Sequence, residues 1–386
     1  MQAMNHIVIV IPGLDRIAGA ERQMILLAHG LHARGWRVSV VALSGVGGSA
    51  AGELTAAGIS FMSLSMRKGL ADPRGWIRFQ GWLRSQRPEI VHAHLPHATW
   101  FARWSRLGAP MRVLIDTIHT SSIGAAGRKL GYRSSNWLPD KVTAVSHAAR
   151  EAHLSARMVT PEVVEVLPNG IDIAHWRPDP AMRIAVRREL GFEGEFLWFA
   201  ACRLDPVKDY PALLRAMVEV PEPGRLVIAG SGPLENELRR LTHDLGLERR
   251  VRFLGFEPDV RRWMQAADGF VLSSRWEGLP MGLLEAAACA LPAVATDVPG
   301  TREALVDGQT GFLAKASNSP ALQAAMTRIM AMPPEDRNAM GQRARQLVLE
   351  RFSLNAVLNS WEALYTDLLM QNTTPSRWRS AAQKAF

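Results

Sequence analysis

The stretch from Ser273 to Gly300 holds the strongest set of residues whose types and spacing could do chemistry. An apolar run ends there, a loop carrying Glu277 follows, and a helix predicted to begin near Met281 carries Glu285. A loop at the carboxyl end of a strand lies where open α/β sheets bind ligands, and the N–H groups at a helix start favour a phosphate or sugar hydroxyls. The two carboxylates could therefore accept hydrogen bonds from paired hydroxyls of a sugar or ribose.

Spacing alone would also fit two solvated glutamates on a surface. The context favours a binding site, because both glutamates lie within Glu-Gly-Leu-Pro-Met-Gly-Leu-Leu-Glu-Ala and a predicted buried strand, Pro292 to Thr296, follows. The residues between them are expected to line the same site: Gly278, Leu279, Pro280, Met281 and Gly282.

A second cluster carries two positive charges. The predicted strand Phe196 to Ala201 runs directly into a loop with Arg203 and Lys208. A guanidinium binds phosphate through two hydrogen bonds, and a nearby ammonium adds a mobile point charge. The pair suits a diphosphate, and an ordinary basic surface loop is the open alternative.

Glycines open two further loops. Gly230 and Gly232 stand in Ala-Gly-Ser-Gly-Pro between a predicted strand and helix, where glycine lets the backbone approach a nucleotide closely. In the first half of the chain, Gly19 opens a predicted helix after a first strand. Neither stretch is a GxGxxG fingerprint, so a tight turn without a ligand remains open for each.

The elements that must position these residues predict two α/β domains. A chain of 386 residues favours two cores, and 47% hydrophobic with 21% charged residues is typical of a globular protein. Apolar runs alternate with helical patterns in both halves, which predicts parallel sheets with crossover helices. Strands are predicted at residues 6–11, 37–43, 59–64, 90–92, 112–117, 142–145, 163–166, 196–201, 225–229, 251–254, 269–272 and 293–296.

The predicted domains are separated by a turn-rich stretch, Leu167 to Asp172. We predict a first domain at 1–168, joined by a returning helix at 353–371, a second domain at 173–352, and a basic tail at 372–386. The apolar run near the N-terminus is too short for a signal peptide, and no run is long enough to span a membrane. Cys202 and Cys289 suit reduced core thiols, so a cytoplasmic protein is expected, with peripheral contact to the inner face of the membrane as an option.

The net charge of +9 is concentrated between Met66 and Arg133, where twelve Lys and Arg face three acidic residues. The same window holds four tryptophans, Trp76, Trp82, Trp100 and Trp104. Interleaved Trp and Arg suit an anionic membrane or single-stranded nucleic acid, and a basic surface over core tryptophans is the plain alternative. We expect the membrane and no nucleic-acid partner. A helix at Pro73 to Gln86 would present Trp76, Phe79 and Leu83 on the inserting side.

Together the clusters resemble the family-4 glycosyltransferases, over most of the chain from Ile7 to about Phe352. The resemblance implies the GT-B architecture: two doubly wound Rossmann-like domains facing across a cleft, with a C-terminal helix crossing back to the first. Two positions depart from the family pattern, since Cys202 and Ala18 stand where many relatives have glycine.

By resemblance, Glu277 would contact the donor sugar near the reacting centre and Glu285 the ribose, while Arg203 and Lys208 hold the diphosphate. Gly19 would approach the diphosphate from the first domain, and His119 matches the family's active-site histidine.

The family implies a retaining hexosyltransferase that needs no cofactor or metal ion. The expected partners are a nucleotide sugar, a UDP-sugar by preference, and a lipid-linked or polysaccharide acceptor. The alternatives are a GT-B epimerase or phosphorylase and a sugar-binding scaffold without activity. The phosphorylase would want a pyridoxal-phosphate lysine that the sequence does not indicate. A nicotinamide oxidoreductase is disfavoured, because Pro12-Gly13-Leu14 after the first strand gives no dinucleotide fingerprint.

Overall fold

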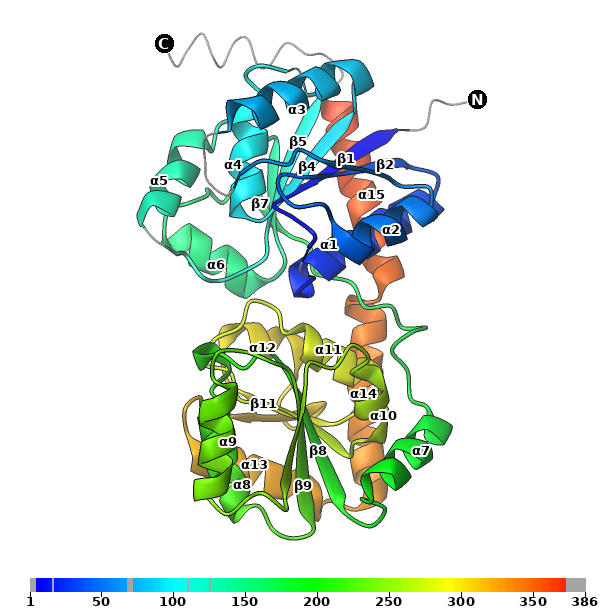
Figure 1. Ribbon diagram of the computed structural model, residues 1–386, viewed down its shortest axis with the longest axis vertical. Coiled ribbons are helices and arrows are strands. Elements are labelled where there is room, and N and C mark those ends of the chain that lie inside the picture. The colour runs from blue at the N-terminus through cyan, green and yellow to red at the C-terminus, as the bar shows by residue number, and fades with distance from the viewer. Residues whose placement is uncertain (1–4, 16, 68–71, 110, 125, 373–386) are drawn as a thin grey trace. The chain divides into compact units, whose positions relative to one another are not determined.

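The computed structural model describes residues 5–15, 17–67, 72–109, 111–124 and 126–372, and it forms two compact units (Figure 1). The first unit comprises Met1–Gly170 together with Asn355–Phe386, and the second comprises Ile171–Leu354. Most of the predicted tail at 372–386 lies outside the described residues.

The first unit is built on a seven-stranded parallel sheet in the order β3-β2-β1-β4-β5-β6-β7. Its strands are β1 (His6–Ile11), β2 (Arg37–Ala42), β3 (Ser60–Ser63), β4 (Ile90–His94), β5 (Val113–Ile118), β6 (Lys141–Ala144) and β7 (Val164–Val166). Its helices are α1 (Gly19–Ala33), α2 (Gly48–Ala56), α3 (Pro73–Gln86), α4 (Pro96–Ser105), α5 (Ala126–Ser135), α6 (His147–Ser155) and α15 (Leu354–Gln371).

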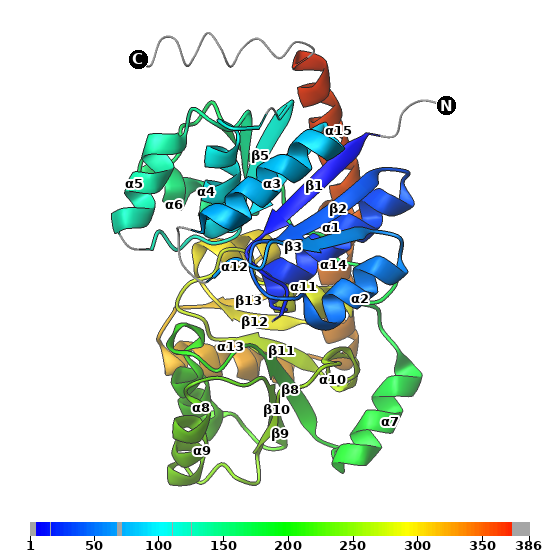
Figure 2. The ribbon, with the colours of Figure 1, turned by 45° about the horizontal axis from the view of Figure 1, so that its top comes forward.

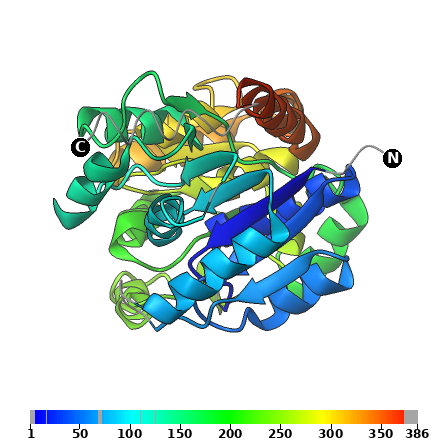
Figure 3. The same cartoon turned by 90° about the horizontal axis from the view of Figure 1, so that it is seen from above.

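Successive side chains of β4 point to opposite faces of this sheet. Val91 and Ala93 belong to a core cluster with Phe79 and Leu83 of α3. His92 points to the other face, where its Nδ1 lies 2.9 Å from the hydroxyl of Tyr365 in α15. The period of two along a strand requires this division, and Figure 3 shows α3 and α15 on opposite sides of the sheet.

The last helix, α15, belongs to the first unit although it follows the second unit in the chain (Figure 2). Glu362 accepts hydrogen bonds from Trp36 Nε1 at 2.8 Å and from the Arg34 guanidinium at 2.5 Å. The Arg112 guanidinium donates to the carbonyl of Leu369 at 2.7 Å. Contacts at the middle and at the C-terminal end of the helix therefore fix it to the first unit.

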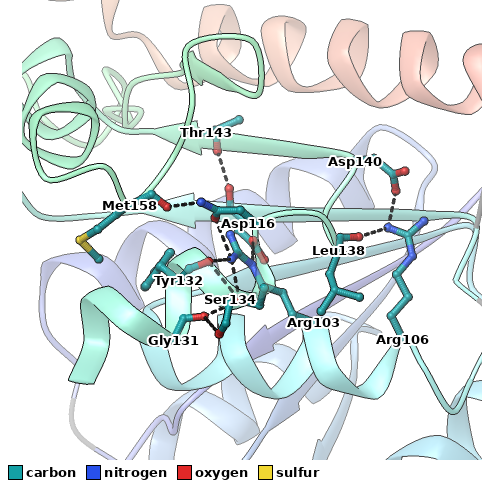
Figure 4. A network of polar contacts seen from close by, with 12 residues as sticks. Arg103, Arg106, Asp116, Gly131, Tyr132, Ser134, Leu138, Asp140, Thr143 and Met158 are labelled. Carbon is teal, nitrogen blue, oxygen red and sulfur yellow. Dashed lines mark hydrogen bonds and ion pairs between the residues drawn. The ribbon is translucent and has the colours of Figure 1, made fainter. Parts of the chain in front are cut away.

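A buried ion pair ties α4 to the first sheet (Figure 4). Arg103 Nε lies 2.6 Å from Asp116 Oδ2 of β5, and both side chains are almost fully enclosed. Arg106 is also buried, and its Nη1 lies 2.7 Å from Asp140 Oδ2. Arg103 and Arg106, two of the twelve basic residues counted between Met66 and Arg133, are therefore buried and paired. The basic surface is smaller than the sequence count suggests.

The second unit has a six-stranded parallel sheet in the order β10-β9-β8-β11-β12-β13. Its strands are β8 (Phe196–Ala201), β9 (Gly224–Ala229), β10 (Val251–Gly255), β11 (Gly269–Leu272), β12 (Ala293–Thr296) and β13 (Gly311–Ala314). Its helical segments are α7 (Pro180–Leu190), η1 (Pro206–Lys208), α8 (Tyr210–Glu219), α9 (Glu235–Asp244), α10 (Arg261–Ala266), α11 (Met281–Ala288), α12 (Pro299–Ala304), α13 (Ser319–Ala331) and α14 (Pro334–Arg351).

Both sheets are doubly wound, and this confirms the predicted fold class. Strand β13 has no counterpart among the predicted strands. It is only four residues long, which leaves too short an apolar run to distinguish it from a turn. Within the described residues, no helix is both long and apolar enough to cross a membrane.

The predicted helix at Pro73 to Gln86 forms with those bounds, but its expected inserting side is wrong. Phe79 and Leu83 are fully buried in the core of the first unit. Trp76, the third predicted residue, is exposed, with an exposed fraction of 37%, and Ile77 beside it is 72% exposed. The 3.6-residue period of the helix does not distinguish two adjacent apolar stripes on its surface. The stripe that packs against the sheet is the one with Phe79 and Leu83.

Candidate active site

The second unit places the sequence-predicted charged residues at the point in its sheet where the strand order reverses. Strands β8 and β11 are neighbours, while the chain proceeds from β8 toward β9 on one side and from β11 toward β12 on the other. The loops after β8 and β11 therefore leave the same edge in opposite directions, which opens the crevice where such sheets bind ligands. Arg203 and Lys208 lie in the first loop, and Glu277 lies in the second.

Three contacts hold these two loops together. The backbone N–H of Arg275 donates to the carbonyl of Val207 at 2.7 Å, and Ser273 Oγ donates to the carbonyl of Lys208 at 2.7 Å. The Arg275 guanidinium also pairs with Asp209, with Nε 3.0 Å from Oδ2. The loops thus form one rigid support, and Ser273, Asp209 and Arg275 are parts of it that sequence reasoning did not single out.

Lys208 and Glu277 form an ion pair at the centre of this support. Lys208 Nζ lies 2.6 Å from Glu277 Oε1, and Ser274 Oγ donates to the same oxygen at 2.5 Å. Glu277 is only 8% exposed. Burial acts to lower the pKa of Lys208, but the negative charges around it, Glu277 among them, outweigh burial and raise that pKa. Lys208 is therefore a fixed positive charge.

Glu285 completes the group from the second turn of α11. Lys208, Glu277, Glu285 and Asp205 are all close enough to Cys202, which follows β8, for their charges to influence the pKa of its thiol. Burial raises the pKa of Cys202 to about 11, so this cysteine is an uncharged packing residue. The structure thus brings Lys208, Glu277 and Glu285 to the same end of the second sheet.

Arg203 has a different environment from Lys208. Its side chain is 73% exposed, and its Nε lies 3.9 Å from Asp205 Oδ2, at the outer limit of an ion pair. A solvent-exposed pair at that distance contributes little to stability. The guanidinium is consequently available to an anionic ligand with little loss of protein contacts.

The loop after β9 requires glycine at positions 230 and 232 for its own packing, whether or not a ligand binds. Gly230 has φ of +142°, and a Cβ there would lie 2.0 Å from the carbonyl oxygen of Cys202. A Cβ on Gly232 would lie 2.3 Å from the carbonyl oxygen of Leu204. Both glycines let the loop after β9 pack against the backbone that leads to Arg203, so the turn and the cation loop are built together.

The segment between the two glutamates lies against the same strand ends. Pro280 is the N-cap of α11, and no side-chain cap bond forms there. Leu279 is buried, and a Cβ on Gly282 would lie 3.4 Å from the carbonyl oxygen of Ala201. Gly278 and Met281 complete this turn.

In the first unit, the predicted Gly19 and His119 follow β1 and β5. Gly19 is the exposed first residue of α1, where Glu21 caps the helix by accepting from the backbone N–H of Ala18 at 3.1 Å. His119 Nε2 lies 2.9 Å from Nδ1 of His94, the last residue of β4. Burial lowers the pKa of His119 to about 4, so its ring is uncharged at neutral pH. Sequence reasoning missed His94, although Val-His-Ala-His at a strand end was its signal.

Comparison with known proteins decides the family. Residues 17–175 match the family described as Glycosyltransferase Family 4, and residues 182–347 match Glycosyl transferases group 1. A GDP-mannose-dependent alpha-(1-6)-phosphatidylinositol monomannoside mannosyltransferase of Mycolicibacterium smegmatis is 32% identical over 69% of this chain and 76% of its own length. The chain belongs to the group 1 glycosyltransferases. It is therefore a glycosyltransferase with two Rossmann-like units.

Two further proteins are similar to this chain. A UDP-Gal:alpha-D-GlcNAc-diphosphoundecaprenol alpha-1,3-galactosyltransferase of Escherichia coli is 24% identical over 78% of this chain and 81% of its own length. Among solved structures, HepE of Anabaena in complex with UDP and glucose has a TM-score of 0.82 at 21% identity and covers 94% of this chain and 99% of its own. That likeness shows the GT-B fold.

No three His, Cys, Asp or Glu side chains gather as a metal-binding group within the described part of the chain.

Proposed function

We propose that this glycosyltransferase transfers a hexosyl unit from a nucleoside diphosphate sugar to an acceptor hydroxyl with retention of the anomeric configuration. The observation that carries the proposal is the Lys208, Glu277 and Ser274 cluster at the point where the second sheet reverses, with exposed Arg203 beside it. It combines two cations for a diphosphate with a carboxylate for sugar hydroxyls.

The two cations would bind the diphosphate and stabilise it as it leaves. Cleavage of the bond between the anomeric carbon and the phosphate oxygen places negative charge on that oxygen. Fixed positive charges close to the oxygen stabilise the transition state more than the ground state. Lys208 is held in place by Glu277, and Arg203 is free to fold over the ligand. In this proposal no divalent ion is needed.

Glu277 would orient the sugar and would not attack it. Its Oε1 already accepts from an ammonium and from a hydroxyl, and both interactions reduce the electron density that a nucleophile needs. Glu285 would accept hydrogen bonds from the ribose, and the Gly230 and Gly232 turn would admit the nucleotide backbone closely.

The proposed reaction balances without further reactants. The acceptor hydroxyl attacks the anomeric carbon on the face from which the diphosphate departs. The new glycosidic bond forms as the bond between the anomeric carbon and the phosphate oxygen breaks. The leaving phosphate oxygen takes the hydroxyl proton. His119 would contact the sugar as a neutral hydrogen-bonding group, and Gly19 would let the start of α1 approach the diphosphate.

A UDP-sugar is the first expected donor. The E. coli relative is named for UDP-Gal and the HepE structure contains UDP, whereas the mycobacterial relative is named for GDP-mannose. The same names support a lipid-linked acceptor, since they specify diphosphoundecaprenol and phosphatidylinositol.

A lipid-linked acceptor requires access to a membrane, and the first unit offers one surface for it. We define the α3–α4 apolar face as Trp76, Ile77, Trp104 and Leu107, whose exposed fractions are 37%, 72%, 39% and 56%. Trp76 donates to Ser105, the neighbour of Trp104, so α3 and the C-terminal end of α4 lie side by side here, and Leu107 follows α4 directly. Exposed Arg74 and Arg84 add positive charge, which favours an anionic bilayer. We propose this face as a peripheral membrane contact, with the protein on the cytoplasmic side.

A donor panel tests the proposed reaction. Thermal unfolding would be followed with UDP-, GDP- and ADP-sugars, because a ligand stabilises by RT ln(1 + [L]/Kd), about 2.7 kcal/mol at a hundredfold excess over Kd. The stabilising donor would then be incubated with a lipid-linked acceptor, and the anomeric configuration of the product read by NMR. An inverted product, or no stabilisation by any nucleotide sugar, contradicts the proposal. Sugar isomerised without an acceptor would indicate an epimerase instead.

A further inference from the structure

We propose that His94 is a positioning residue that fixes the tautomer of His119, so that His119 presents an Nδ1–H donor to an oxygen of the nucleotide sugar. The inference rests on the proposed function, in which His119 contacts the donor. It concerns a residue that has no role in the reaction described above.

The ring of His94 is held rigidly behind His119. His94 ends β4 and is 2% exposed, and its backbone neighbour across the sheet is Thr117 of β5. The ring of His92 packs against it with the centroids 3.9 Å apart. His92 is itself bound to Tyr365 and to Thr117, whose Oγ1 lies 2.6 Å from its Nε2. A ring so enclosed has one orientation available.

One proton joins the two rings. His94 Nδ1 and His119 Nε2 are 2.9 Å apart, so one of these nitrogens carries a hydrogen and the other accepts it. Burial lowers the pKa of both rings, and neither carries a second proton at neutral pH. The tautomer of each ring therefore determines that of the other.

The outer nitrogens decide the direction. His94 Nε2 and His119 Nδ1 are both enclosed, and neither has a hydrogen-bond partner among the described residues. If His119 were the donor, His94 Nε2 would carry an N–H with no acceptor, deep in the unit. An enclosed N–H without an acceptor is rarer in proteins than an enclosed lone pair. If His94 donates, the N–H without a protein partner is on His119, which is the less buried residue of the two. The proposal requires that an oxygen of the nucleotide sugar reach this enclosed N–H on binding.

The consequence for the donor is a hydrogen bond of fixed direction. A neutral imidazole whose Nε2 accepts from His94 must carry its proton on Nδ1. That N–H can donate to a sugar hydroxyl oxygen or a phosphate oxygen. Without His94, the His119 ring could rotate and exchange tautomers, and only part of the molecules would present the donor.

Three variants of His94 separate donation from packing. His94→Leu removes the bond, and we expect kcat/KM to fall roughly threefold to tenfold, the range of one neutral hydrogen bond. His94→Asn places an amide N–H on the same γ carbon as imidazole Nδ1, and it should recover most of the loss. His94→Asp can only accept when ionised, and it should not recover it. His97→Leu, an exposed histidine of α4, is the matched control and should match the wild type.

The tautomer is read directly by ¹⁵N NMR of histidine-labelled protein without substrate, because protonated and bare ring nitrogens have distinct shifts. The wild type should show His119 protonated at Nδ1 and bare at Nε2. A proton on Nε2 overturns the proposal, as does equal activity of the leucine and asparagine variants. If the wild type uses no nucleotide sugar, the proposed function fails, while the NMR result still decides the role of His94.

Discussion

Lys208 and Arg203 carry the same charge in neighbouring positions, and their surroundings predict different effects of removing them. Both Lys208→Ala and Arg203→Ala should weaken UDP binding by about 1.5–3 kcal/mol, the range for hydrogen bonds to charged groups. Only Lys208→Ala should also destabilise the second unit, by about 1–3 kcal/mol, because it leaves the buried Glu277 without its cation.

Titration calorimetry with UDP and denaturant unfolding measure the two effects separately. Arg240→Ala, an exposed cation on α9, is the control for loss of one positive charge. Equal UDP affinity for Lys208→Ala and the wild type would remove the diphosphate assignment. Equal loss of stability for Lys208→Ala and Arg203→Ala would show that the pair with Glu277 is unimportant.

What the sequence could predict at this scale was the residue type at each strand end. Arg203, Lys208 and Glu277 stand in loops directly after apolar runs, and parallel strands bring such loops to one edge. The contacts within the site could not be predicted from the sequence. Ser274 and His94 act through partners that depend on side-chain rotamers and on strand register, and single-sequence spacing records neither.

At the scale of elements, the α3–α4 apolar face predicts how the protein meets a bilayer. Ile77→Glu and Leu107→Glu replace the two most exposed of its side chains with charges that an anionic surface repels. Sedimentation with anionic liposomes at low salt should show binding by the wild type, a marked decrease in the double variant, and release at high salt. Ile184→Glu, an exposed apolar residue of α7, is the control.

Binding that is indifferent to lipid charge, or that survives in the Ile77→Glu and Leu107→Glu variant, contradicts this assignment. The predicted bounds of α3 are confirmed, whereas two of the three residues on its predicted inserting side, Phe79 and Leu83, are buried. Helix bounds follow from local signals such as Asp72, which caps the helix, and Pro73 at its start. Which apolar stripe faces the core depends on the sheet beneath, which involves strands distant in sequence.

At the scale of the whole molecule, the buried histidines lie in one unit. His92 and His94 lie on β4 and His119 follows β5, while the described histidines of the second unit, His175 and His243, are exposed. Burial lowers the pKa of His92 to about 3 and that of His119 to about 4, and it holds the pKa of His94 well below the ordinary value. The two units should therefore respond differently to acid.

The sign of the response follows from proton counting. Between about pH 6.5 and pH 4 the unfolded histidines bind protons that the folded ones do not, so stability falls as pH falls. From pH 7 to pH 5, His92 and His119 should each lower the free energy of unfolding of the first unit by about 2 kcal/mol. His94 and His6, whose pKa values burial also lowers, should add to that loss. Hydrogen exchange at both pH values would assign the loss, which should affect β4 and α15 and spare β8. In His94→Leu, with one titrating group fewer, the pH dependence of the free energy of unfolding should decrease. Equal loss in both units, or none in the first, would mean that these rings accept protons in the folded state, and a neutral His119 could then no longer be assumed at the site.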